Sequence, residues 1–170
     1  MDVDTGITSE VFTIKSETKL IDIFNNIINK KSEACLNYID SLNLDKNTKI
    51  VVVGTYFTGV GIVKKLRKEY NNILLIDIYP HLKELLDTDI GGDYKKSIEF
   101  STNLELINSG DVVIDTTGFG GLTVEQSSEI NAEVFLIEDP VAEDNDRLLK
   151  DKNNIHERIN AVNAPNKAIL

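Results

Sequence analysis

The 170-residue chain has few of the residues that build cross-links or bind anionic polymers. Its one cysteine, Cys35, excludes an internal disulfide and a cysteine-based zinc site. Basic residues are also scarce: 18 Lys and Arg stand against 28 Asp and Glu, a net charge of −10. Nucleic acids and anionic membrane surfaces attract basic proteins, so this charge argues against both as partners. A small molecule remains as the expected partner.

Long apolar runs are missing as well. The longest end after a few residues, far short of the roughly 20 that cross a membrane as a helix. The N-terminal residues Met1 to Thr5 are acidic and lack the pattern of a signal peptide. The hydrophobic fraction of 41% is ordinary for a globular protein. We therefore expect a cytoplasmic protein with one domain and one core.

Short apolar runs alternate with amphipathic ones, which is typical of βαβ units in a mainly parallel sheet. We predict a Rossmann-like α/β fold with flanking helices, in which residues 48–170 form the nucleoside-binding domain. Residues 1–47 form an N-terminal arm, with a strand near 10–15 and one or two helices behind it. Strands are expected at 50–53, 73–77, 97–100, 111–115 and 133–137, and helices at 62–68, 80–87, 104–108, 125–130 and 147–150. The run at 133–137 is the last clear strand, and the residues from 151 to 166 are expected to be a polar stretch.

The arm carries apolar residues at a helical period between Leu20 and Leu42. Such a face must cover the sheet or a partner subunit. Cys35 lies on this stripe and has no neighbour in sequence that would favour a thiolate. We therefore expect Cys35 to serve packing rather than redox or nucleophilic chemistry.

The glycine-spaced loop after the first buried strand holds the main functional signal. A phosphate-binding loop needs a lysine and a hydroxyl after its second glycine, where this chain has Val60 and Gly61. ATP or GTP binding by that motif is excluded. The dinucleotide fingerprint starting at Gly54 needs a glycine where Tyr56 stands, so that the backbone can approach a pyrophosphate. A dinucleotide is therefore disfavoured, and NAD(P) is kept as the alternative cofactor.

S-adenosylmethionine (SAM) binds at the same kind of turn, carries no phosphate and brings positive charge. Asp77 ends the second strand, 23 residues after Gly54, where a carboxylate can accept both ribose hydroxyls of either cofactor. The alternative is that Asp77 caps a helix or lies in a solvated loop. Together the loop and this acid indicate a nucleoside ligand and do not identify it.

Two further strand ends should face the same crevice. Thr116, Thr117 and Gly118 follow the fourth strand, where hydroxyls and backbone N–H groups can hold a carboxylate or a substrate oxygen, or can serve plain turn chemistry. Glu138 and Asp139 follow the fifth, where a carboxylate can act as a base, bind an amino group or be solvated. The acidic run at 143–146 is expected to be a solvated face, with magnesium as the alternative, and His81 and His156 have no ligand-like spacing.

Three segments together resemble one family: Val51 to Gly59, Asp111 to Gly121, and Phe135 to Pro140. They look like the archaeal, methanogen HcgC-like family, SAM-dependent enzymes that methylate a ring carbon of a pyridinol during assembly of the iron-guanylylpyridinol cofactor of [Fe]-hydrogenase. The resemblance covers about residues 48–140. Family members run further at the C-terminus, so a shorter relative or a truncated chain is expected.

The resemblance implies a SAM site over the glycine loop, with Asp77 on the ribose and the Thr116 to Gly118 loop near the methyl donor and acceptor. A homodimer or higher homo-oligomer is expected. No catalytic side chain and no metal site is assigned. The alternatives are an NAD(P)-binding oxidoreductase and a non-catalytic Rossmann-like protein that dimerises through its N-terminal helices. Candidate cofactor-binding residues are Gly54, Thr55, Tyr56, Phe57, Thr58, Gly59, Asp77, Ile78, Thr116, Thr117 and Gly118; candidate substrate-binding residues are Thr117, Glu138 and Asp139.

Overall fold

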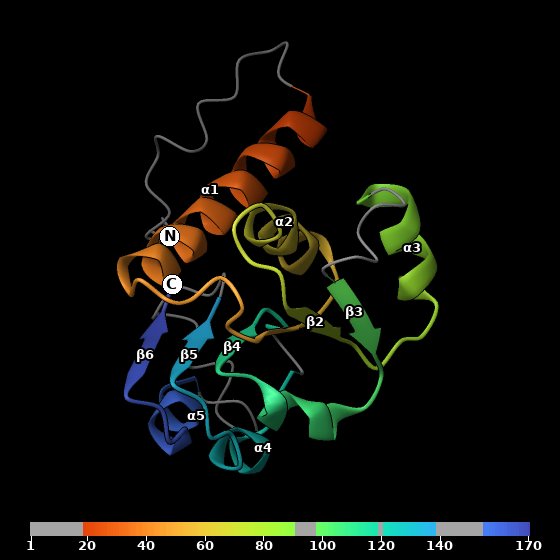
Figure 1. Ribbon diagram of the computed structural model, residues 1–170. Helices are drawn as coiled ribbons and strands as arrows, with labels where there is room; N and C mark the ends of the chain where they lie inside the picture. The colour runs from red at the N-terminus through yellow and green to blue at the C-terminus, as the bar shows by residue number, and fades with distance from the viewer. Residues whose placement is uncertain (1–18, 91–97, 119–120, 139–154) are drawn as a thin grey trace, which may run out of the picture.

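The computed structural model describes residues 19–90, 98–118, 121–138 and 155–170. They form a six-stranded parallel sheet with helices on both faces (Figure 1). The strand order is β3-β2-β1-β4-β5-β6, so the chain leaves β1 in one direction and β4 in the other. The strands are β1 (Ile50–Val53), β2 (Ile73–Ile76), β3 (Ile98–Ser101), β4 (Val112–Asp115), β5 (Val134–Ile137) and β6 (Asn166–Ile169).

Side chains alternate between the two faces of the sheet, as the two-residue period of a strand requires. In β1, Ile50 and Val52 point into one core cluster, and Val51 and Val53 point into the other. The first cluster is covered by α1, α2 and α3, and the second by η3, α4 and α5. The helices are α1 (Leu20–Ser41), α2 (Phe57–Leu66), α3 (Leu82–Asp89), η3 (Leu104–Ser109, a 3-10 helix), α4 (Val124–Ser128) and α5 (Ile155–Ala161).

The N-terminal helix α1 is one continuous helix and belongs to the core. It lies beside α2, above the half of the sheet that carries β4, β5 and β6 (Figure 1). Its residues Cys35 and Ile39 are fully buried in the first core cluster. Together with α3, helices α1 and α2 therefore cover one face of the sheet.

The predicted α/β class and the first five strands are confirmed. The helix predicted at 62–68 begins earlier, at Phe57, and the prediction for the end of the chain is wrong. The predicted polar stretch from 151 to 166 contains α5, and β6 begins at its last residue and continues to Ile169. The edge strand β6 buries only every other residue partly, so its sequence lacks the apolar run of a central strand. The helix predicted from Pro80 begins later, at Leu82, because a turn precedes it in which the Tyr79 N–H bonds to the Asp77 carboxylate.

The predicted strand at 10–15 and the helix at 147–150 lie outside the described residues. Within the described ranges, no helix is long and apolar enough to cross a membrane.

The contact between α1 and α2 leads to a stability prediction. A Cβ on Gly61 would lie 2.5 Å from Cγ2 of Ile28 and 2.7 Å from Oγ of Ser32. Overpacking of this kind outweighs the better helix propensity of alanine, so Gly61→Ala should lower the free energy of unfolding by about 1–3 kcal/mol in urea titrations.

The control is a double-mutant cycle with Ile28→Ala, which removes the methyl that Gly61→Ala would strike. The two losses should be less than additive. Additive losses would show that α1 and α2 are not in tight contact at this point.

Candidate functional site

The candidate site lies at the carboxyl edge of the sheet, where the chain directions out of β1 and β4 diverge. In open parallel sheets, ligands bind in the crevice that this divergence leaves. Gly54, Asp77, Thr116 and Glu138 each come directly after a strand, on β1, β2, β4 and β5 respectively. These strands are neighbours in the sheet, so the fold brings the predicted strand-end residues to one edge.

The glycine loop is folded tightly against the end of β4. Gly54 has φ +95°, a conformation that favours glycine, and a Cβ there would lie 2.8 Å from Oγ1 of Thr116. A Cβ on Gly59 would lie 1.9 Å from the Gly54 carbonyl oxygen. These two glycines are therefore explained by the close approach of the β1 loop, α2 and the β4 loop, before any ligand is considered.

Asp77 is buried and holds the glycine loop. Its Oδ2 accepts hydrogen bonds from both the backbone N–H and the hydroxyl of Thr55, each at 2.9 Å. Its Oδ1 accepts from the Tyr79 N–H at 3.1 Å. Asp77 is thus neither a helix cap nor a solvated loop residue, and the ribose role stays a prediction.

Thr116 closes the junction between β1 and β4. Its N–H donates to the Val53 carbonyl at 2.9 Å. Its hydroxyl shares one proton between the carbonyls of Val53 (2.9 Å) and Gly54 (3.1 Å). The neighbouring Thr117 is half-buried and donates both its N–H, at 3.0 Å, and its hydroxyl proton to Oδ1 of Asp115.

The hydrogen-bond polarity of this crevice follows from those contacts. A hydroxyl has one proton and two lone pairs. The protons of Thr116 and Thr117 are used inside the protein, so both hydroxyls can only accept from a ligand. The N–H groups of Gly54 and Thr55 also donate internally, to the Ile76 carbonyl and to Asp77. The junction of β1 and β4 therefore suits a ligand that brings donors or positive charge.

The first turn of α2 offers the opposite polarity. No side chain caps its N-terminus, which leaves N–H groups of the first turn for a carboxylate or another anion. Tyr56 and Phe57 stand beside this turn with 57% and 72% of their surfaces exposed, and Ile78 is 58% exposed on the neighbouring loop. Thr58 lies within the turn and is half-buried. These side chains can cover the apolar parts of a ligand.

Glu138 is not solvated. It is 3% exposed and forms an ion pair with Lys31 of α1, 107 residues away in sequence. Burial, and secondarily the Glu138 charge, raises the pKa of the Cys35 thiol to about 12. Asp139 and the acidic run at 143–146 lie outside the described residues. Within the described part of the chain, no cluster of three or more His, Cys, Asp or Glu could hold a metal ion.

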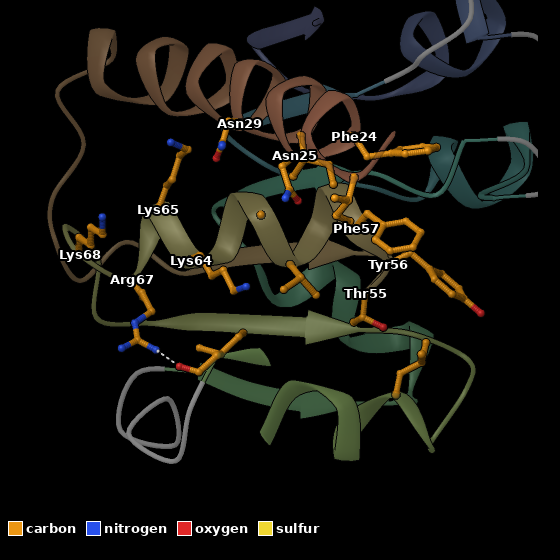
Figure 2. A pocket seen from close by; sticks show the side chains of 16 residues that line it. Phe24, Asn25, Asn29, Thr55, Tyr56, Phe57, Lys64, Lys65, Arg67 and Lys68 are labelled. Atoms are coloured by element: carbon orange, nitrogen blue, oxygen red, sulfur yellow. Dashed lines mark hydrogen bonds between the residues drawn. The ribbon is translucent and has the colours of Figure 1, made fainter. Parts of the chain in front are cut away.

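A groove of about 1120 Å³ follows the outer side of α2, between α1 and α3. Figure 2 shows an aromatic end, where Phe24 of α1 faces Tyr56 and Phe57, and a basic end formed by Lys65, Arg67 and Lys68 of the C-terminal half of α2 and the turn after it. The groove meets the crevice only through the start of α2. Most of it is therefore a separate surface from the predicted site.

Sequence reasoning missed two charged residues that contact the strand ends, Lys31 and Arg158. Arg158 is 1% exposed on α5 and pairs with Oδ2 of Asp115. A weak signal for it existed: Arg158 lies between apolar residues at helical spacing, Ile155, Ile159 and Val162. Lys31 has no comparable signal, because it stands among other polar residues of a long helix.

The burial of Cys35 gives a chemical prediction. A thiol with a pKa near 12 and no exposed surface should react with a disulfide reagent at about pH 8 only when the protein opens. Labelling of the native protein should be slower than that of the urea-unfolded protein by orders of magnitude, followed by absorbance of the released thiolate. Equal rates would contradict the packing of α1 on the sheet.

HcgC from Methanococcus maripaludis, cocrystallised with SAH and pyridinol, superposes with a TM-score of 0.69 at 27% identity over 92% of this chain. The chain spans 57% of the length of that protein. Shikimate dehydrogenase in complex with NADP+ shares the fold alone, with a TM-score of 0.53 at 16% identity over 84% of this chain and 49% of the other. A family model described as "FeGP cofactor biosynthesis protein, methyltransferase HcgC" matches residues 4–170. The chain therefore belongs to the HcgC family.

Proposed function

We propose that this chain binds SAM at the junction of β1 and β4 and serves methyl transfer to a small hydroxylated pyridine in cofactor biosynthesis in the cytoplasm. One observation carries the choice of cofactor. The hydroxyls of Thr116 and Thr117 have donated their protons within the protein, so the junction accepts hydrogen bonds rather than donating them. The HcgC structure that contains SAH and pyridinol supports the same reading.

The polarity of the site fits SAM better than a dinucleotide. When bound, SAM supplies a methyl group on a sulfonium, together with an ammonium, ribose hydroxyls and a carboxylate. Asp77 retains one lone pair, on Oδ1, for a ribose hydroxyl, and the half-buried Thr117 can accept from a ligand donor. The free N–H groups at the start of α2 suit the carboxylate. A pyrophosphate would bind at the same N–H groups of α2, so these groups do not separate the two cofactors. What separates them is Tyr56, which stands where the dinucleotide fingerprint needs a glycine, and the acceptor character of the junction.

The chain's own contribution to the reaction is positioning. A pyridinolate is an electron-rich carbon nucleophile, so the protein mainly has to align the two reactants and exclude water. Tyr56, Phe57 and Ile78 offer apolar surface for that purpose. Glu138 directly follows β5 and is paired with Lys31 of α1. Its carboxylate is proposed to contact the substrate. No general base is assigned.

Titration calorimetry with SAM, SAH and NADH tests the proposal. SAM and SAH should bind, and NADH should bind far more weakly or not at all. Tight binding of NADH without binding of SAH would identify a dinucleotide protein instead. Absence of binding by all three would favour a non-catalytic Rossmann-like protein.

The role of Asp77 can be tested with a matched pair of variants. Asp77→Ala should weaken SAH binding by about 1–3 kcal/mol, because a charged acceptor and the support of Thr55 are both lost. Asp111→Ala is the control: Asp111 also accepts a backbone N–H, that of Lys49, but at the amino edge of the sheet. An equal loss in both variants would mean that the effect is one of stability.

We also propose that the chain forms a homo-oligomer through the N-terminal part of its arm, residues 1–47. Leu20, Ile21 and Phe24 are 68%, 59% and 48% exposed at the start of α1. Exposed apolar residues grouped in this way mark contact surfaces. Light scattering after gel filtration should show more than one chain per particle, and Phe24→Asp should reduce the mass. A monomeric native protein would refute this proposal and leave the cofactor site untouched.

A further inference from the structure

Asp115, the last residue of β4, and Arg158 form a fully buried ion pair. Both are 1% exposed, and they come from different elements, the end of β4 and the middle of α5. Desolvation by burial lowers the pKa of Arg158 to about 10, which leaves the guanidinium charged at neutral pH. Its Nε also lies 3.4 Å from Oγ of Ser127 on α4. Arg158 therefore ties the β4 end to α4 and α5.

The two oxygens of Asp115 are divided between two tasks. Oδ2 is paired with Arg158, and Oδ1 takes the N–H and the hydroxyl proton of Thr117. Asp115 is thus the link between a buried cation and the loop at the crevice. An ionised carboxylate can only accept, so as long as Arg158 keeps Asp115 ionised, the Thr117 hydroxyl must donate inward.

We propose that Arg158 is a positioning residue that acts through Asp115 to fix the Thr117 loop with its hydroxyl lone pairs turned toward the ligand. This inference rests on the proposed function, because it names the group that makes the β4 end of the SAM site an acceptor. Arg158 touches neither cofactor nor substrate in this account. Its effect reaches the ligand through two contacts, Arg158 to Asp115 and Asp115 to Thr117.

The proposed role explains why the fold buries two charges. Burying two charges is expensive, and well-packed apolar residues often replace such a pair without loss of stability. Stability alone would not require one oxygen of the carboxylate to bind the loop that carries Thr117. Here Oδ1 is used wholly by Thr117, a residue predicted for both cofactor and substrate.

The test compares three variants at a temperature where each is folded. Arg158→Met should weaken SAH binding at least about fivefold, the loss expected when a charge-assisted contact is disturbed. Arg158→Lys keeps the cation and should recover most of the affinity. Val162→Ala, a truncation of a buried residue just after α5, is the control and should lower the melting temperature without changing SAH binding.

A measurement without ligand keeps the proposal separate from the choice of cofactor. In hydrogen exchange followed by NMR, Arg158→Met should speed exchange of the Thr117 amide, which bonds to Asp115. The Thr116 amide, which bonds to Val53, should change little. If Arg158→Met does not fold, Arg158→Gln, which removes the charge and keeps a hydrogen-bond donor and Asp115 itself, takes its place and should give the same exchange pattern.

The outcomes are distinguishable. Native protein that binds no SAH refutes the proposed function, while the exchange pattern still decides on Arg158. Native protein that binds SAH, together with unchanged affinity and unchanged Thr117 exchange in Arg158→Met, overturns the positioning role. Equal losses of affinity in Arg158→Met and Val162→Ala would also overturn it, because the effect would then be one of folding.

Discussion

The close approach of the β1 loop to the β4 loop is the constraint on which the site depends. Gly54 can adopt its turn only without a side chain, and Thr116 then seals the junction by bonding to the carbonyls of Val53 and Gly54. Asp77 holds the loop from one side, and Asp115 holds Thr117 on the other. Since these contacts use up hydroxyl and amide protons, the packing of the fold sets the hydrogen-bond polarity that a ligand meets.

That polarity agrees with the absence of the middle glycine of the dinucleotide fingerprint. Tyr56 stands where a pyrophosphate-binding loop needs close backbone approach, and its side chain is exposed rather than folded away. The same fold serves dinucleotides in shikimate dehydrogenase, so the fold does not decide the ligand. In this chain we propose that the ligand is selected by the hydroxyl and amide groups at the ends of β1 and β4, which donate their protons within the protein.

The sequence predicted the central fold because buried parallel strands are continuous apolar runs. The positions of Gly54, Asp77 and Thr116 to Gly118 at one sheet edge followed from strand-to-helix alternation alone. The edge strand β6 carries only a weak pattern, since half of it faces solvent. Lys31 with Glu138, and Asp115 with Arg158, join residues far apart in sequence. Spacing marks Arg158 only weakly, by its apolar neighbours on α5, and holds no signal for which charges pair, so the two pairs could be found only in three dimensions.

A crystal structure of this protein grown with SAH tests the central claim most directly. The account predicts SAH at the carboxyl edge between β1 and β4, with a ribose hydroxyl on Oδ1 of Asp77 and its carboxylate at the first turn of α2. Ligand donors, not acceptors, should face the hydroxyl of Thr117. Ligand lying along the outer side of α2, or a ligand acceptor against Thr117, would contradict the account.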